Sequence, residues 1–444
     1  MIAVLMQTVE DALAELPMFD VHTHLTCGSL AARGAHDILL YHMVVSDLYS
    51  AGCPDGARLT EFPGVLTDEE AHHRLERAVP YFRRTFNTST SWMLRRILRD
   101  LYDWDDPVHE DNWRRLDGLV RERSKDPGWP SSILRGLNIS RTCTEHSRRA
   151  DGVDDYRMQY SLEWGMFTRP QWGQFDAPLY ELERCWGVEP GPPLPIGMRE
   201  RPTAERVIRS ADDARQAVAD YVTAIPGNVI SIGTHVSTDI DYQNVQAEEF
   251  DAALARRETA GREEQDVYSS YIQEQFLSEL EARRQDIVYQ FSFGAEPLPY
   301  ETGSRLSQAT IGQVARMAAE HPGLRFNCLL GVRHANQALC TVARELQNFN
   351  LCGYWWHNLY PDVMEQVFSE RLDMLPLNRH IGFFSDAYTI EWVYGKAVLV
   401  RRQMAKVLSE RVNSGWCSLG DALAIAQQVL YVSPMEFLRM EPTA

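Results

Sequence analysis

The sequence predicts an α/β fold, a (β/α)8 barrel of the TIM type with a helical insertion after the first strand. Short apolar runs alternate with longer helical patterns, as in a parallel barrel. Eight such runs occur, and 444 residues are enough for a barrel with insertions. We therefore expect one barrel domain over residues 1–444.

The predicted strands are short apolar runs bounded by polar or turn-forming segments. The weakest are Gln159–Phe167, which also fits a helix, and Val229–Ile232, which is short. In chain order the runs are Met18–Val21, Ile139–Thr142, Gln159–Phe167, Val229–Ile232, Ile287–Phe293, Arg325–Leu330, Leu351–Trp356 and His380–Phe384.

An unusually long stretch separates the first two strands. Thr67–Arg84 and Ser91–Asp103 have the apolar spacing of amphipathic helices, with Pro80 interrupting the first. We interpret residues 35–135 as a helical insertion within the barrel domain.

Two other segments have distinct compositions. Ala247–Arg284 is charged with helical periodicity, which predicts a solvated pair of helices. Gly187–Pro202 is rich in proline and glycine and predicts an ordered surface loop or lid.

Composition argues against several classes of function. The formal charge is −18, and no Lys/Arg cluster lies beside stacking aromatics, so nucleic acid is not an expected partner. No window approaches eighteen uninterrupted apolar residues, and Met1–Leu16 lacks a basic region, so neither a membrane span nor a secretion signal is expected. Eight scattered cysteines without a Cys-x-x-Cys pair predict reduced, mostly buried thiols of a cytoplasmic protein.

Three side chains predict a metal site. His22 and His24 end the first apolar run, and residues two apart in a strand project from the same face. Asp386 ends the last run, and the eighth strand lies beside the first when a barrel closes. Two imidazoles and a carboxylate suit one divalent ion, with Zn²⁺ as the expected one. The alternatives are unliganded histidines and, for Asp386, an N-cap of the following helix.

At this point the chain resembles the uronate isomerase (glucuronate isomerase) family of the amidohydrolase superfamily. The match covers most of the chain and is least clear between about residues 175 and 285. The tandem tryptophans after a glycine are its most specific part. In chain order the matching motifs are Phe19-Asp20-Val21-His22-Thr23-His24-Leu25, Asp37–Leu48 with Tyr41-His42, Leu137-Asn138-Ile139-Ser140, Phe167-Thr168-Arg169-Pro170, Phe326–Asn348 with Arg333, Gly353-Tyr354-Trp355-Trp356 and Phe384-Ser385-Asp386-Ala387.

Two positions depart from the family pattern. The family has Asp-x-Arg after the last strand, whereas Asp386-Ala387-Tyr388 stands here, so a basic residue has become a phenol. Some members also carry a histidine in the fifth strand, where this chain has Ser292. The resemblance implies an altered substrate preference, with Tyr388 facing the substrate.

The resemblance implies an aldose–ketose isomerase that acts on a sugar acid such as D-glucuronate or D-galacturonate. Such a reaction moves a proton between neighbouring carbons through an enediol. Asp386 beside the metal would shuttle the proton, and Tyr41 or His42 would act on oxygen.

The same resemblance implies the groups that hold the sugar acid. Arg169 and Arg333 would bind its carboxylate, unless they form ordinary salt bridges. Either Trp355 or Trp356 would cover the sugar ring, and the other would be core. Oligomerisation of the chain with itself stays open.

Two other readings stay open. One is a mononuclear metal-dependent hydrolase or decarboxylase acting on another carboxylated substrate, with Asp386 as general base. His235, after the fourth strand, would be an extra ligand in that case, although a loop histidine is the commoner explanation. The other is a descendant without activity that keeps the barrel for oligomerisation or ligand sensing.

Overall fold

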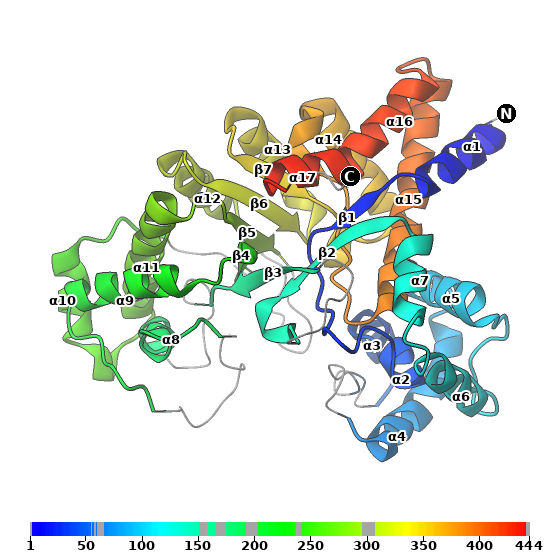
Figure 1. The fold of residues 1–444 in the computed structure, drawn as a ribbon, viewed down its shortest axis with the longest axis horizontal. Coiled ribbons are helices and arrows are strands. Elements are labelled where there is room, and N and C mark those ends of the chain that lie inside the picture. The colour runs from blue at the N-terminus through cyan, green and yellow to red at the C-terminus, as the bar shows by residue number, and fades with distance from the viewer. Residues whose placement is uncertain are drawn as a thin grey trace.

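Eight parallel strands in chain order form one sheet that curls into a half-barrel with helices around it (Figure 1). This confirms the predicted fold class. The computed structural model describes residues 2–54, 56, 59, 66–150, 158–165, 175–191, 203–236, 242–294 and 307–440, except the side chains of residues 2, 3, 235 and 236. The strands are β1 (Met18–Asp20), β2 (Ile139–Glu145), β3 (Met158–Glu163), β4 (Val229–Val236), β5 (Val288–Phe293), β6 (Arg325–Leu330), β7 (Phe349–Cys352) and β8 (His380–Ile381).

All eight predicted strands exist, including the two weakest. Several are shorter than their predicted runs, and the last two end well before the predicted residue, at Cys352 instead of Trp356 and at Ile381 instead of Phe384. Strand β7 ends at Cys352 because Gly353 turns the chain with a φ of +46°. Strand β8 ends at Ile381, and the next amide, that of Gly382, donates to the carbonyl of Val429 at 2.6 Å instead of to a strand.

The edge strands β1 and β8 are connected by two kinds of contact. No strand ladder joins β8 to β1 within the described residues. On one side, the π-helix η8 (Gln428–Val432) contacts both strands. Beyond the strand ends, Asp386 N donates to His22 O at 2.9 Å and His24 N donates to Ala387 O at 2.8 Å. The segments after β1 and β8 are therefore adjacent, as the strand order predicts.

An apolar cluster fills the inside of the sheet below this joint. It is drawn from at least six strands and from the C-terminal segment, and all of its core members are buried. Members include Phe19, Cys143, Val288, Leu329, Cys352, Ile381, Met435 and Phe437. The interior is thus packed mainly by apolar side chains, although Gln290 and Asn327 are also buried there and share a hydrogen bond of 3.3 Å.

The helices cover the outside of the sheet. Helix α1 packs on α15 and α16 beside the C-terminal helices (Figure 1). The long helices are α1 (Ile2–Ala14), α8 (Ala177–Cys185), α9 (Ala211–Ala224), α10 (Ala247–Leu254), α11 (Arg262–Arg283), α12 (Gln308–Glu320), α13 (Asn336–Glu345), α14 (Pro361–Met374), α15 (Ile390–Asn413) and α16 (Leu419–Gln427), followed by the short α17 (Ser433–Phe437).

The segment between β1 and β2 is helical, as predicted, although its status as an insertion within one domain stays a prediction. Thr67 caps α4 in a capping box with Glu70, and the helix gives way to η2 (Val79–Arg84) where Pro80 occurs. Its helices are α2 (Ala35–Leu39), α3 (His42–Ser50), α4 (Asp68–Ala78), α5 (Ser89–Tyr102), α6 (Trp113–Arg123) and α7 (Trp129–Gly136), at the lower right of Figure 1.

The prediction of a solvated helix pair over Ala247–Arg284 is wrong for α11. One face of α11 is buried, and its core-facing residues include polar types that the hydrophobic pattern does not count. Gln273 is fully buried because it accepts from Trp164 Nε1 at 2.8 Å and donates to Tyr289 OH at 2.9 Å. The predicted loop at Gly187–Pro202 lies mostly outside the described residues.

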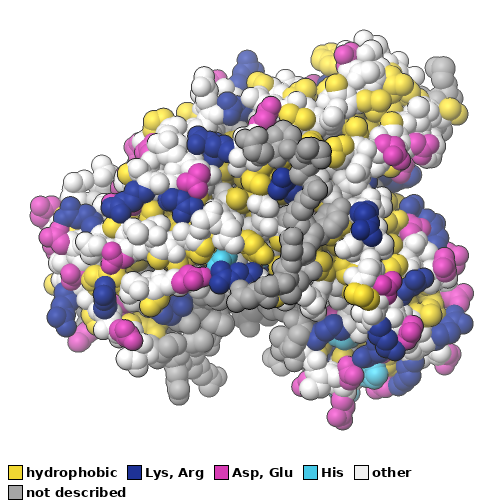
Figure 2. Space-filling view, in the orientation of Figure 1, with side chains coloured by type: hydrophobic (Ala, Val, Ile, Leu, Met, Phe, Trp, Pro, Cys, Tyr) yellow, Lys and Arg dark blue, Asp and Glu magenta, His cyan; other side chains and the backbone are white. Residues whose placement is uncertain are grey.

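Surface and cysteine features agree with the composition. Figure 2 shows basic and acidic side chains intermixed on the face in view. None of the described helices is long and apolar enough to cross a membrane. The structure describes all eight cysteines; none of them forms a disulfide and all but Cys417 are buried, which confirms the prediction of mostly buried thiols.

Gly353 is predicted to be required for the packing of β7 against the chain after β8. A Cβ atom there would lie 2.3 Å from Phe384 Cδ1, and the residue has a positive φ. We expect Gly353→Ala to destabilise the protein by about 2–4 kcal/mol through overpacking and backbone strain. Gly118→Ala is the matched control, because a Cβ atom there meets nothing within 4 Å. It should stabilise α6 by about 0.5–1 kcal/mol. Thermal unfolding checks both, and equal midpoints would contradict the packing argument.

Candidate metal centre

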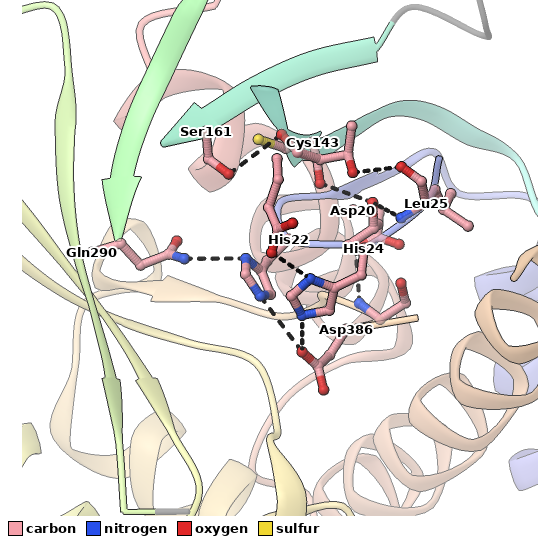
Figure 3. Close-up of polar contacts among 12 residues, drawn as sticks. Asp20, His22, His24, Leu25, Cys143, Ser161, Gln290 and Asp386 are labelled. Carbon is pink, nitrogen blue, oxygen red and sulfur yellow. Dashed lines mark hydrogen bonds and ion pairs between the residues drawn. The ribbon is translucent and has the colours of Figure 1, made fainter. Parts of the chain in front are cut away.

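The predicted metal ligands lie together where β1 and β8 end (Figure 3). His24 Nε2 is 3.1 Å and His22 Nε2 is 3.5 Å from the same oxygen, Asp386 Oδ1. The three ligand atoms all lie within 4.8 Å of one another. Asp386 does not cap the following helix, because Thr389 is the N-cap of α15. We call these three residues the metal group.

The spacing of the metal group fits one ion. Two ligands bound at about 2.0–2.1 Å to a tetrahedral ion lie about 3.3–3.4 Å apart. The observed separations of 3.1 and 3.5 Å fall on either side of that value. Both histidine side chains keep about one sixth of their surface exposed, at 16% and 17%, so a ligand can reach them from the mouth. The donor set therefore fits a divalent metal with open positions.

A second carboxylate, Glu145, supports the metal group from outside. It ends β2, and its Oε1 lies 2.8 Å from His24 Nδ1. A carboxylate on Nδ1 fixes the ring so that Nε2 points at a metal. Glu145 was not predicted, because the second strand was expected to end at Thr142; the signal that could have indicated it is the one that indicated Asp386, a carboxylate at the end of a strand.

Two further side chains support Asp386. The φ of Asp386 is +52°, a left-handed conformation that is uncommon for residues other than glycine. Its carbonyl accepts from Tyr41 OH at 2.8 Å and from Lys396 Nζ at 3.4 Å. Lys396 also donates to Tyr41 OH at 2.9 Å and is 2% exposed. The only sequence signal for Lys396 is a lysine within an otherwise apolar stretch of helix.

Tyr41 and His42, the two residues predicted as alternatives for acting on the substrate oxygens, have different surroundings. The hydroxyl of Tyr41 donates to the backbone carbonyl of Asp386 and accepts from Lys396 Nζ, so Tyr41 stabilises the backbone of Asp386. His42 Nε2 is buried and has no hydrogen-bond partner among the described residues. The ring of His42 lies 4.8 Å from Trp356 and 5.7 Å from Tyr388 between centroids.

The two tryptophans occupy different environments. Trp355 is 6% exposed and belongs to the interior apolar cluster. Trp356 is half-buried and its ring contacts His42, so it is the tryptophan on the side of the metal group. Both tryptophans follow the end of β7 at Cys352, so the alternation of side chains along a strand does not apply to them. Their different surroundings result from the turn at Gly353.

The remaining predicted site residues lie at different distances from the metal group, and the side chains of two of them fall outside the described part of the structure. Tyr388 stacks on His24 with ring centroids 4.7 Å apart and an interplanar angle of 13°. Arg333 is exposed in η5 (Arg333–Ala335), beyond the end of β6, and forms no hydrogen bond or ion pair with the three described residues of the metal group. Arg169 lies outside the described residues, as does the side chain of His235.

An amide on the fifth strand faces the metal group. Gln290, two residues before Ser292 on β5, places its Nε2 3.4 Å from His22 Nδ1 (Figure 3). Ser292 shares that face of the strand and is 9% exposed. Gln290 thus contacts the Nδ1 atom of His22 as Glu145 contacts that of His24, and no motif in the sequence indicated it.

Neighbouring groups keep both Asp386 and His24 charged in the metal-free protein. Burial raises the pKa of Asp386, but hydrogen bonds from His22 and His24 and the charge of Lys396 hold it well below its usual value. Burial lowers the pKa of His24, yet Glu145 and Asp386 outweigh burial and raise it to about 9 in the metal-free protein. Burial and the charge of Lys396 lower the pKa of His42 to about 3, so His42 is neutral at working pH.

Comparison with known proteins was informative only at the level of structure. No family model matches the chain, and no curated protein sequence matches it. Among solved structures, the fold is similar to a uronate isomerase from Bacillus halodurans, with a TM-score of 0.69, 15% identity, and 99% of this chain and 97% of that chain covered. It is also similar to a uronate isomerase from Thermotoga maritima, with a TM-score of 0.74, 14% identity, and coverage of 98% and 97%. A glucuronate isomerase from Caulobacter crescentus has a TM-score of 0.75, 12% identity, and coverage of 100% and 95%. At these identities the likeness establishes the fold.

Metal affinity is predicted to increase with pH. A metal must displace the proton from His24 Nε2, and with a pKa of about 9 that nitrogen is mostly protonated at neutral pH. Raising the pH from 6.5 to 8.5 should therefore strengthen the apparent affinity for Zn²⁺ by up to about 100-fold. Competition titration against a chromophoric chelator at fixed ionic strength measures this dependence, and a flat profile would refute it.

Glu145→Gln is predicted to weaken metal binding and to flatten its pH dependence. At pH 8.5, where protons compete least, we expect affinity to fall by about 10–100-fold, because the amide orients His24 less firmly and makes it less basic. The flattening follows because the pKa of His24 returns toward its ordinary value. Glu122→Gln is the control, because the Glu122 side chain is 73% exposed and its ion pair is with Lys125 on the surface. Identical affinities for both variants would remove Glu145 from the site.

Proposed function

We propose that this protein is a metal-containing aldose–ketose isomerase that converts a hexuronate, D-glucuronate or D-galacturonate, into the corresponding keto acid. The observation that carries the proposal is the metal group at the joint of β1 and β8, in a fold whose solved likenesses include uronate isomerases over at least 95% of both chains. The metal, with zinc as the expected ion, and the mechanism belong to the proposal.

Asp386 is the proposed proton carrier. Its Oδ1 faces both imidazoles, whereas Oδ2 accepts no hydrogen bond from the described residues and forms only a long ion pair, at 3.9 Å, with Lys396 Nζ. One oxygen can therefore belong to the metal group while the other removes a proton from the carbon next to the carbonyl and returns it to the neighbouring carbon. Its low pKa keeps it deprotonated between turnovers.

His42 is the proposed partner of the substrate oxygens. Its buried Nε2 lacks a partner among the described residues, and a buried polar nitrogen left unpaired is costly unless a ligand satisfies it. As a neutral imidazole it can exchange a proton with the oxygens of the enediol. The bound ion would polarise the carbonyl oxygen.

The rest of the site would hold the sugar acid. Trp356 would cover one face of the sugar ring, and Arg333 with Arg169 would approach from the strand ends. Tyr388 can donate one hydrogen bond to a hydroxyl, so we expect a substrate preference shifted from that of enzymes with arginine there. Activity in the cytoplasm stays an expectation.

The metal-replete protein is predicted to isomerise hexuronates. NMR in deuterated water should reveal the keto acid and deuterium at the carbon next to the carbonyl. Asp386→Asn should lower turnover by about 100-fold or more, because the amide cannot carry the proton. Asp111→Asn is the control, because that side chain is 96% exposed. Metal analysis separates lost chemistry from lost metal.

The absence of turnover on every hexuronate, with metal bound, would refute the proposed reaction. Release of carbon dioxide or of a hydrolysis product from a carboxylated substrate would instead identify the hydrolase or decarboxylase reading of the same metal group.

A further inference from the structure

We infer that Arg148 is the cation that binds the carboxylate of the substrate, and that Tyr388 is the platform on which its guanidinium lies. The inference rests on the proposed function for the identity of the ligand, a sugar acid. Arg148 ends the short turn η3 (His146–Arg148) directly after β2, so it belongs to the same rim as the metal group.

The guanidinium of Arg148 has described hydrogen-bond partners at two of its nitrogens, whereas the third has none among the described residues. Its Nε donates to Glu145 Oε2 at 2.6 Å, and its Nη1 lies 3.4 Å from Thr26 Oγ1. Its backbone carbonyl accepts from Cys27 N at 2.9 Å. Nη2 bonds to no described residue, and the side chain is 21% exposed. An arginine positioned in this way presents N–H donors to a carboxylate at little cost in side-chain entropy.

A continuous chain of contacts connects Arg148 to the metal group. Glu145 accepts from Arg148 through one oxygen and faces His24 Nδ1 through the other. The guanidinium carbon also lies 5.5 Å from the centroid of Tyr388, whose ring stacks on His24. The cation is therefore fixed one ring away from His24. A sugar acid needs this separation, because its carbon chain places the carboxylate away from the reacting end.

Tyr388 holds the cation without consuming its donors. An aromatic face attracts a guanidinium through its π system, so the N–H groups stay available at the edge. This gives the phenol a role that does not require it to neutralise a carboxylate, which it cannot do.

The other described cations near the site are less suitable. Lys396 is 2% exposed and is engaged by Tyr41 and Asp386. Arg333 is exposed, but no described contact connects it to the metal group. Arg148 alone among these three combines an open edge with a rigid link to His24.

The test compares Arg148→Gln and Arg148→Lys with Arg149→Gln, a neighbour that faces Glu189 instead. Calorimetry would use D-gluconate, a sugar acid without a carbonyl to isomerise, and kinetics would use D-glucuronate and neutral D-glucose. We expect Arg148→Gln to weaken gluconate binding and raise the KM for glucuronate by about 10–100-fold, with kcat within a few-fold. Arg148→Lys should fall between, and Arg149→Gln should match the wild type.

Tyr388 is tested by the same titration. Tyr388→Phe keeps the ring and loses only the hydroxyl, so gluconate binding should weaken by no more than a few-fold, whereas Tyr388→Leu should shift binding toward that of Arg148→Gln. Metal content of every variant shows whether an effect passes through Glu145 and His24 instead. Loss of metal in Arg148→Gln that accounts for the whole effect would overturn the inference.

The remaining outcomes separate this inference from the proposed reaction. A wild type that binds gluconate without turning over glucuronate, and loses binding in Arg148→Gln, supports the carboxylate site and refutes the isomerase. Unchanged gluconate affinity in Arg148→Gln, or the same change for glucose as for the sugar acids, overturns the inference. So does a wild type that binds no sugar acid.

Discussion

Two backbone hydrogen bonds between the ends of the first and last strands organise the candidate site. Asp386 N donates to His22 O, and His24 N donates to Ala387 O, so each metal-group residue is itself part of the joint. The joint requires Asp386 to adopt a left-handed backbone, which Tyr41 and Lys396 stabilise at its carbonyl. Strain at this position is thus offset by buried hydrogen bonds from elements distant in the sequence.

Positively and negatively charged side chains alternate with increasing distance from His24. Asp386 and Glu145 face His24 on its two nitrogens, and Lys396 and Arg148 lie behind these carboxylates. Each buried charge is therefore near one of opposite sign, which limits the cost of burying it. The arrangement keeps a donor set for a cation within a chain of formal charge −18, while a guanidinium stays open at the rim.

Much of the fold could be predicted from apolar periodicity. Eight buried runs alternating with helices predicted eight strands in order, and a carboxylate closing the last run predicted its meeting with the histidines of the first. The ends of β7 and β8 could not be predicted, because Gly353 turns against Phe384 and η8 occupies the edge beyond Gly382. The buried face of α11 escaped prediction because its buried polar groups find partners on other elements: Gln273 bonds to Trp164 and Tyr289, and the hydroxyls of Tyr268 and Tyr271 donate to backbone carbonyls.

The sequence by itself determined the order of the strands and the three residues of the metal group, because burial and metal ligation each demand particular residue types at a fixed spacing along the chain. Only the tertiary structure decided the residues around them. Glu145, Gln290, Lys396 and Arg148 are ordinary polar residues until folding brings them to one rim. The choice between Trp355 and Trp356 depended likewise on one backbone turn. Contacts between distant elements are set by three-dimensional packing, which no local pattern encodes.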